Sequence, residues 1–265
     1  MNQINKIIRI SILSIKKEFA YPIKLVTEIL LMIIDIFIFY SIWKSIYGGE
    51  NIFGNINYEQ IITYIILARI LYQMMAWGQN LSISKVIRNG DITMELIRPL
   101  SFQFFQYILK IGQFIKDILV IIIPGIIIGM FIGLKAPVSS LNMMLFVLSV
   151  FGAITIIFMV DFIVACVTFY TVSSWGLQVF KQAMFAFFSG SLIPITLMPD
   201  VLQKIVNVLP FKSMVYFPIS IYIGTIDYKE ILNGFIIQIV WIISLFIISK
   251  IFYNISLRKV TIAGG

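Results

Sequence analysis

Long apolar stretches alternate with short polar ones along the whole chain. The apolar stretches cover residues 25–47, 59–80, 104–133, 141–170, 178–198 and 231–255. Each is a continuous run, without the alternation of a half-buried strand, and reaches the roughly 20 residues that a helix needs to cross a bilayer. Backbone in lipid must satisfy its own hydrogen bonds, so the pattern predicts an all-α, polytopic membrane protein with six transmembrane helices.

Composition supports this prediction and excludes a soluble fold. Apolar and aromatic residues make up 60% of the 265 residues and charged residues 12%, and the mean hydropathy is +1.00. Soluble domains contain about 25% charged residues. A folded chain of this size still exposes much of its surface, and so much apolar surface is stable only against lipid.

The first 24 residues combine cations with an apolar helical face. Ile4, Ile8 and Ile12 share one side of a helical wheel, whereas Lys6 and Arg9 lie on the other side. This pattern is typical of a helix that lies in the membrane interface with its cations toward anionic headgroups. A frayed basic tail is the alternative.

The distribution of lysine and arginine indicates the orientation. If the N-terminus lies inside the cell, most cations fall on the cytoplasmic side, among them Lys110, Lys116 and Lys181. Cytoplasmic loops of membrane proteins carry such an excess. We therefore expect both termini in the cytoplasm. Contact with the inner leaflet accounts for the net charge of +8, so no nucleic acid partner is expected.

Residues 88–101, RNGDITMELIRPLS, form a charged segment between the second and third apolar stretches. Gly90 permits a sharp turn, Asp91 can cap a short helix from Ile92, and Pro99 disfavours helix at the residue before it. We expect a short helix across the cytoplasmic face, and its mixture of apolar and charged side chains favours contact with a protein partner.

Two segments resemble the ABC-2 type permeases. The first pattern consists of Ile87, Gly90, Ile92, Leu96, Ile97, Arg98, Pro99, Leu100 and Ser101. The second is the series SGSLIPITLMPDVLQKIVNVLPF at residues 189–211, followed by Pro218 and Tyr222-Ile223-Gly224. The chain is similar in particular to the branch in which two related permeases work with one kind of ATPase.

The resemblance implies a single ABC-2 type transmembrane domain over residues 1–265, with an interfacial helix at 1–24, a coupling loop at 86–100 and an outer hairpin at 199–224. It implies that the coupling loop docks on an ABC ATPase subunit, with Leu96 as apolar anchor. The coupling residues are expected to be Arg88, Gly90, Asp91, Glu95, Leu96, Arg98 and Pro99. It also implies a second permease subunit, in a heterodimer rather than a homodimer, and a bacterial cytoplasmic membrane.

The segment after the fifth apolar stretch is expected to act as an outer gate. The gate residues are expected to be Gly190, Pro194, Pro199, Pro210 and Phe211. Pro199 can open a short amphipathic helix and Pro210 can stop it. The alternative role for this segment is an interfacial plug that packs against the sixth span.

The chain lacks the residues for ATP hydrolysis and for most enzyme chemistry. No G-x-x-x-x-G-K-[ST] motif occurs, so Mg-ATP is expected on a separate partner chain and no cofactor on this one. The sequence has no histidine and a single cysteine, Cys166, which excludes His-dependent catalysis and cysteine metal clusters. We therefore predict a transport subunit, not an enzyme, and no metal site.

Asp35, Arg69 and Asp161 lie within the apolar stretches. Charges at this depth usually face protein or water. Asp35 and Arg69 fall at similar depth on adjacent antiparallel spans, so we expect them to pair. The pair is either a structural bridge or part of a polar substrate path or proton site.

The leading hypothesis is the membrane subunit of an ABC exporter that works by alternating access. Its main alternative is an ion-coupled secondary transporter that uses Asp35 or Asp161. A membrane scaffold without transport activity, or a polytopic enzyme, is a third alternative, and it predicts no partner ATPase.

Overall fold

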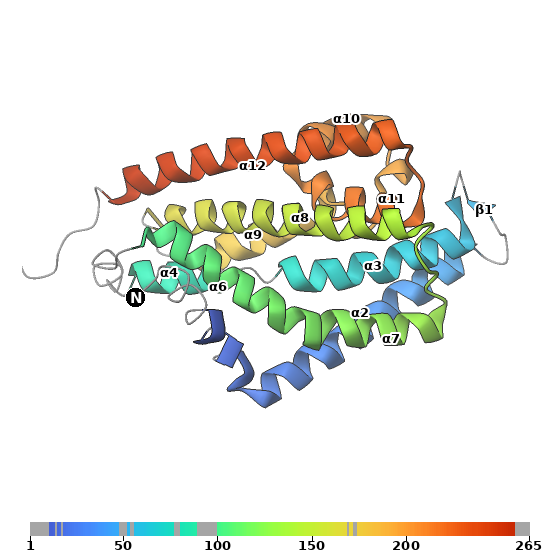
Figure 1. Cartoon of the computed structure of the whole chain (residues 1–265), viewed down its shortest axis with the longest axis horizontal. Helices are drawn as coiled ribbons and strands as arrows, with labels where there is room; N and C mark the ends of the chain where they lie inside the picture. The colour runs from blue at the N-terminus through green and yellow to red at the C-terminus, as the bar shows by residue number, and fades with distance from the viewer. Residues whose placement is uncertain are drawn as a thin grey trace, which may run out of the picture.

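The computed structural model describes residues 11–13, 15–16, 18–47, 52–53, 56–76, 80–88, 100–168, 170–171 and 174–257. Helices make up most of this part of the chain, and the long ones run side by side along the longest axis of the molecule (Figure 1). A short antiparallel hairpin is formed by β1 (Ile52–Phe53) and β2 (Ile56–Asn57), in which Phe53 is opposite Ile56.

The helical elements follow the predicted apolar stretches. The long helices are α2 (Pro22–Tyr47), α3 (Tyr58–Ala76), α6 (Phe102–Asp117), α7 (Ile123–Ile132), α8 (Ser140–Val167), α9 (Ser174–Phe188) and α12 (Tyr228–Leu257). The shorter elements are α4 (Asn80–Arg88), η1 (Ile118–Ile122), η2 (Ile195–Leu197), α10 (Asp200–Val208), η3 (Pro210–Ser213) and α11 (Tyr216–Ile223).

Four of these segments are long and apolar enough to cross a membrane. They are Pro22–Tyr47, Phe102–Ile132, Ser140–Val167 and Tyr228–Leu257. The all-α, multi-pass prediction is confirmed at this level. The other two predicted stretches also form helices, α3 and α9, but neither meets the same criterion, and α9 ends about ten residues before the predicted boundary at 198.

The early end of α9 has a local cause. Gly190 adopts a φ of +81°, a left-handed conformation that other residues adopt at a cost, and the helix stops just before it. Pro194 then stands at the N-cap position of η2. The second half of the predicted fifth stretch is therefore a turn and a short 3₁₀ helix, which explains why its apolar composition misled the prediction.

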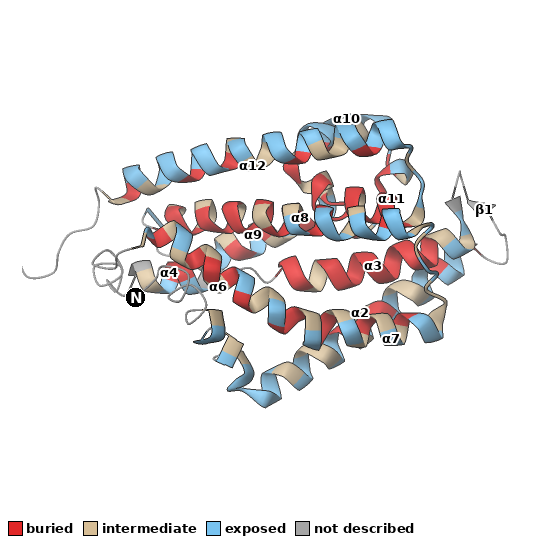
Figure 2. Ribbon diagram, viewed as in Figure 1, coloured by how far each residue is buried: buried red, intermediate tan, exposed pale blue. Residues whose placement is uncertain are grey.

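Helix α3 lies in the centre of the molecule. Every residue from Ile61 to Leu71 is buried, and Figure 2 shows α3 almost entirely in the buried colour, whereas α12 is mostly exposed. A helix that is apolar on all sides is stable where protein surrounds it. Helix α12 instead packs one side against α8 and leaves residues such as Ile236, Val240 and Ile243 exposed, as a lipid-facing helix does.

The third span contains a π-helical turn, η1, between α6 and α7. Such turns are rare and arise where the regular hydrogen-bond ladder is disturbed. Pro124, at the start of α7, has no backbone N–H to give to that ladder. After it, α7 approaches α3 closely: a Cβ at Gly125 would lie 2.7 Å from Ile70, and one at Gly129 would lie 2.8 Å from Ile66.

The predicted interfacial helix at 1–24 is only partly covered, because residues 1–10 lie outside the described residues. Helical backbone is present at 11–13, 15–16 and 18–19, a turn follows at Ala20, and α2 begins at Pro22. Lys24 therefore belongs to α2 and not to the N-terminal helix.

Candidate functional site

The predicted coupling loop lies between α4 and α6. Gly90, Asp91, Glu95, Leu96, Arg98 and Pro99 fall outside the described residues, and Arg88 is the last residue of α4. At the other end of the segment, the Ser101 hydroxyl accepts a hydrogen bond from the Phe104 N–H at 3.4 Å and caps α6. Helix α4 packs on α8 and α9 through the buried residues Ile83 and Ser84.

Arg69 is buried and is the centre of a group that we call the arginine cluster, with Asp35, Phe39, Tyr72 and Ser191. Its Nη1 lies 3.6 Å from Asp35 Oδ2, so the predicted pairing of these residues is present. The guanidinium lies 3.9 Å from the centroid of the Phe39 ring and 4.9 Å from that of Tyr72. Nη2 donates a hydrogen bond to the Ser191 carbonyl. Arg69 thus connects α3 with α2 and with the turn after α9.

A second hydrogen bond fastens the same turn to α3. The Tyr64 hydroxyl donates to the Gly190 carbonyl at 2.6 Å. A Cβ at Gly190 would lie 2.8 Å from the Tyr64 hydroxyl oxygen, so this approach requires glycine in addition to the positive φ. The Tyr216 N–H donates to the Ser189 carbonyl at 3.1 Å, which joins α11 to the turn. Gly190, one of the predicted gate residues, is therefore a contact point between three elements.

The other predicted gate residues stand at the ends of short helices. Pro194 precedes η2, Pro199 precedes α10, and Pro210 begins η3. The Phe211 ring stacks on Phe188 at the end of α9, with a centroid distance of 6.3 Å. The segment is more than a surface hairpin, because α11 is largely buried against α8 and α3.

A second polar group joins four helices, and we call it the lysine network: Glu28, Lys110, Lys116, Asp117, Asp161 and Lys181. Lys181 of α9 and Asp161 of α8 form an ion pair at 2.7 Å, and both side chains are almost fully buried. Lys181 Nζ also donates to the carbonyl of Ala76, the last residue of α3, at 3.1 Å. The amide nitrogen of Gln178 donates to the same carbonyl at 3.2 Å.

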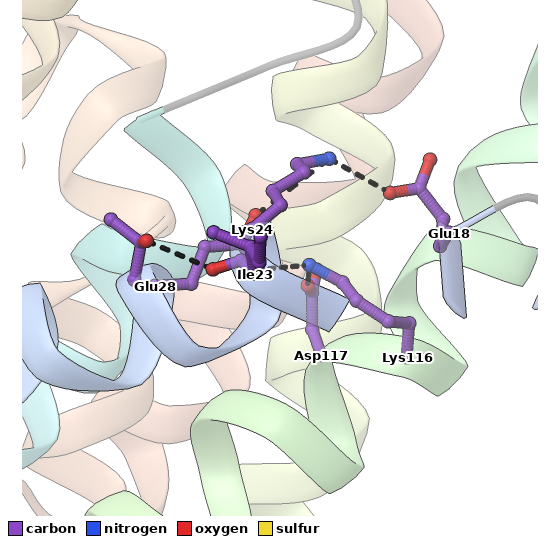
Figure 3. Close-up of polar contacts among 7 residues, drawn as sticks. Glu18, Ile23, Lys24, Glu28, Lys116 and Asp117 are labelled. Carbon is purple, nitrogen blue, oxygen red and sulfur yellow. Dashed lines mark hydrogen bonds and ion pairs between the residues drawn. The ribbon is translucent and has the colours of Figure 1, made fainter. Parts of the chain in front are cut away.

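The rest of the lysine network lies where α2 meets α6. Lys116 Nζ lies 2.8 Å from Glu28 Oε2 and 2.7 Å from Asp117 Oδ1, as Figure 3 shows. Lys24 pairs with Glu18 at 3.1 Å on the exposed side of this group. Lys110 interacts electrostatically with both Asp117 and Asp161. It therefore links the Lys116 side of the network with the Lys181 side.

Most of the lysine network was missed by the sequence interpretation. Lys110, Lys116 and Lys181 were counted among cations at the cytoplasmic surface, yet each is 2–3% exposed and lies within a helix. One signal was available: Asp161 lies alone in a long apolar stretch, and a charge there needs a partner. The partner could not be chosen from the sequence, because the helix face that Lys181 presents depends on how α9 packs.

Helices α3 and α9 are thus connected at two places. The carbonyl end of α3 accepts hydrogen bonds from the first half of α9, and Tyr64 and Arg69 hold the turn that follows α9. The α4 helix, which leads to the segment 86–100, begins only a few residues after Ala76. This arrangement can carry a displacement from that segment to the turn at 189–191 through one antiparallel pair of helices.

Comparison with known proteins identifies a family for this chain. The family model described as ABC-2 family transporter protein matches residues 29–264. No curated protein matches the chain significantly. The matched region includes α3, α9 and the segments 86–100 and 189–224, and so it contains nearly all the residues of the two polar groups.

Proposed function

The chain belongs to the ABC-2 family of transporter proteins, and on this premise we propose that it is the permease subunit of an ATP-driven exporter. Family membership makes it a membrane transport component and not an enzyme. We propose further that Mg-ATP is bound and hydrolysed on separate ABC ATPase subunits, because the chain contains no P-loop motif. The active complex would contain a second permease, with a heterodimer favoured, in a bacterial cytoplasmic membrane.

Six spans remain our proposal for the topology, with α3 and α9 as the second and fifth. A helix of 19 residues is about 28 Å long, close to the roughly 30 Å of a bilayer core. Two polar residues of α3, Tyr64 and Arg69, form hydrogen bonds inside the protein with the turn after α9. Six spans place both termini on one side, which we take as the cytoplasmic side from the positive charge bias.

The observation that carries the mechanism is the double connection between α3 and α9. In our proposal, ATP binding moves the partner ATPases, the coupling segment at 86–100 follows, and α4 passes the motion to the junction of Ala76 with Gln178 and Lys181. The α3–α9 pair then displaces the turn at 189–191 and opens the hairpin at 199–224. Alternating access follows if the translocation path beside this helix pair opens first on one side of the membrane and then on the other.

The contacts give the ion-coupled alternative no support. Asp161 forms a buried ion pair with Lys181, and Asp35 pairs with Arg69. Charges engaged in this way join helices.

The proposal is tested by purifying the tagged chain from its native membranes in mild detergent, identifying the proteins that co-purify and measuring ATP hydrolysis. We expect an ATPase subunit with a P-loop and a second permease. Less ATPase should co-purify with the variant Glu95→Lys. The control is Glu59→Lys, which changes an exposed glutamate at the start of α3, away from α4, and the normal amount of ATPase should co-purify with it. Equal recovery from both variants would count against docking at 86–100.

A further inference from the structure

A cavity of about 310 Å³ lies between the α10–η3–α11 segment and the first turns of α12. Its lining includes Asn207, Lys212, Phe217, Glu230, Asn233 and Ile237. The volume is at the lower end of the range for small-molecule sites. It is separate from the arginine cluster and the lysine network, which contribute none of its lining residues. In Figure 1, α10 lies beside the first turns of α12, near one end of the molecule.

The cavity presents one positive and one negative group. Lys212 Nζ donates to the Asn207 side-chain oxygen at 2.5 Å and lies 5.5 Å from the centroid of the Tyr216 ring. Burial lowers the pKa of the Lys212 ammonium, although the Glu230 carboxylate opposes this shift. An ammonium that is partly removed from water favours a bound anion, because the anion replaces the lost hydration.

Glu230 also lines the cavity, and a capping box at the start of α12 holds its side chain. Its Oε2 accepts a hydrogen bond from the Asp227 N–H at 3.2 Å, and the Asp227 carboxylate accepts one from the Glu230 N–H at 2.7 Å. Among the described residues, no ion pair within 4.0 Å joins Glu230 to Lys212. Both charged groups therefore remain available to a ligand in the cavity that they line.

The floor of the cavity is apolar and leads to the lipid-facing side of α12. Glu230, Gly234 and Ile237 follow each other at helical spacing on one face. The Phe217 ring lies directly against Gly234, where a Cβ would be 2.0 Å from a ring carbon. Ile237 is itself exposed, and Val240, three residues further along the helix, lies beside it and is also exposed. A ligand with a polar head and an apolar tail would have a continuous path from the cavity into the bilayer.

We propose that this cavity binds the headgroup of a zwitterionic phospholipid that carries a primary amine. Lys212 and Asn207 contact the phosphate, the Glu230 carboxylate binds the ammonium, and the acyl chains lie along α12. The cavity is large enough for the headgroup alone, which fits a lipid whose tails remain in the membrane. The proposal does not depend on the transport direction or on the partner ATPase.

The test uses the full chain in detergent and native mass spectrometry with added phosphatidylethanolamine or phosphatidylglycerol of the same acyl composition. We expect the wild type to retain phosphatidylethanolamine more strongly. Lys212→Met should weaken retention of both lipids about tenfold, the effect of losing one charge-assisted contact. Glu230→Gln keeps the capping acceptor, so it should weaken only phosphatidylethanolamine and remove the preference between the two lipids.

Lys204→Met is the matched control, because this exposed lysine of α10 does not line the cavity. It should leave both affinities unchanged. Soluble glycerophosphoethanolamine, added at the same concentration as the lipid, should not displace it. Equal lipid retention by the wild type and Lys212→Met, an unchanged lipid preference in Glu230→Gln, or full displacement by the soluble headgroup would overturn the assignment.

Discussion

The arginine cluster and the lysine network both place charges inside a membrane protein, but they are built differently. Asp161 and Lys181 lie 2.7 Å apart and are almost completely buried, so each depends on the other for its charge compensation. Arg69 lies 3.6 Å from Asp35, whose side chain is 31% exposed, and it also binds the Ser191 carbonyl and two aromatic rings. The cations of the lysine network are compensated by carboxylates inside the protein, whereas Arg69 has one carboxylate and several uncharged partners.

Because of this difference, the two groups should respond differently when a substitution removes one partner. Loss of one partner from a closed, buried pair leaves an uncompensated charge, which is far more costly than the pair itself is stabilising. When Arg69 loses one partner, its other partners remain in place. We therefore expect substitutions of similar size to have unequal effects at the two sites.

The largest effect is expected for Asp161→Asn. It leaves Lys181 buried without its carboxylate, and stability should fall by about 3–5 kcal/mol. Thermal unfolding of the purified chain in detergent measures this. The double variant Asp161→Leu/Lys181→Met is the control: it removes both charges, and Gln178 still serves the Ala76 carbonyl, so most of the stability should return. If the double variant is no more stable than Asp161→Asn, the closed-pair interpretation is wrong.

A smaller loss is expected for Arg69→Met. The variant removes the hydrogen bond to the Ser191 carbonyl together with the contact to Asp35, and stability should fall by about 2 kcal/mol. The link from α3 to the turn at 189–191 is also weakened, so ATP hydrolysis by the assembled complex should lose its coupling to substrate. The same unfolding assay and an ATPase assay with and without substrate check both effects. Normal coupling in Arg69→Met would remove the arginine cluster from the proposed path.

Tyr64→Phe tests the second link to the same turn. It deletes one hydroxyl and leaves the Gly190 carbonyl without its donor, so we expect a loss of about 1 kcal/mol. Tyr228→Phe, which deletes the hydroxyl of an exposed tyrosine, is the matched control and should be neutral in the same unfolding assay. An equal effect of the two variants would mean that the turn does not depend on Tyr64.

Asp35→Asn should have the smallest effect, below about 1 kcal/mol. Arg69 keeps its carbonyl and ring partners, and the lost contact to Asp35 is 3.6 Å long, too long for a strong hydrogen bond. Unfolding and assembly with the partner subunits are measured together. A loss as large as that of Asp161→Asn would break the comparison between the two groups. Normal assembly with lost transport would show that the Asp35–Arg69 pair has more than a structural role.

The positions of most helices along the chain could be predicted from the sequence, since long apolar runs decide where helices form. The Asp35–Arg69 contact was also predictable, because consecutive spans are neighbours and both residues lie near mid-span. The contacts of Arg69 with Ser191 and of Lys181 with Asp161 were not. They join segments that are distant in sequence or depend on helix rotation, which an apolar average along the chain does not specify.

The end of α9 shows a second limit of sequence reasoning. Residues 189–198 contain enough Leu, Ile and Met to extend the apolar stretch, yet Gly190 and Pro194 turn the chain there. Both residues are predicted gate residues, but the predicted end of the fifth stretch at residue 198 follows the hydropathy of the chain and not the backbone preferences of these two residues. Local backbone chemistry deserved more weight than composition at this point.

The lysine network contains three carboxylates, of Glu28, Asp117 and Asp161, and three ammonium groups, of Lys110, Lys116 and Lys181, so formally it has no net charge. Moving one elementary charge through a membrane potential of 100 mV requires about 2.3 kcal/mol. A neutral group that moves as one body transfers no charge across the field. If the helices that carry it rock during transport, this part of the cycle is electrically silent, and its rate does not depend on the energised state of the membrane.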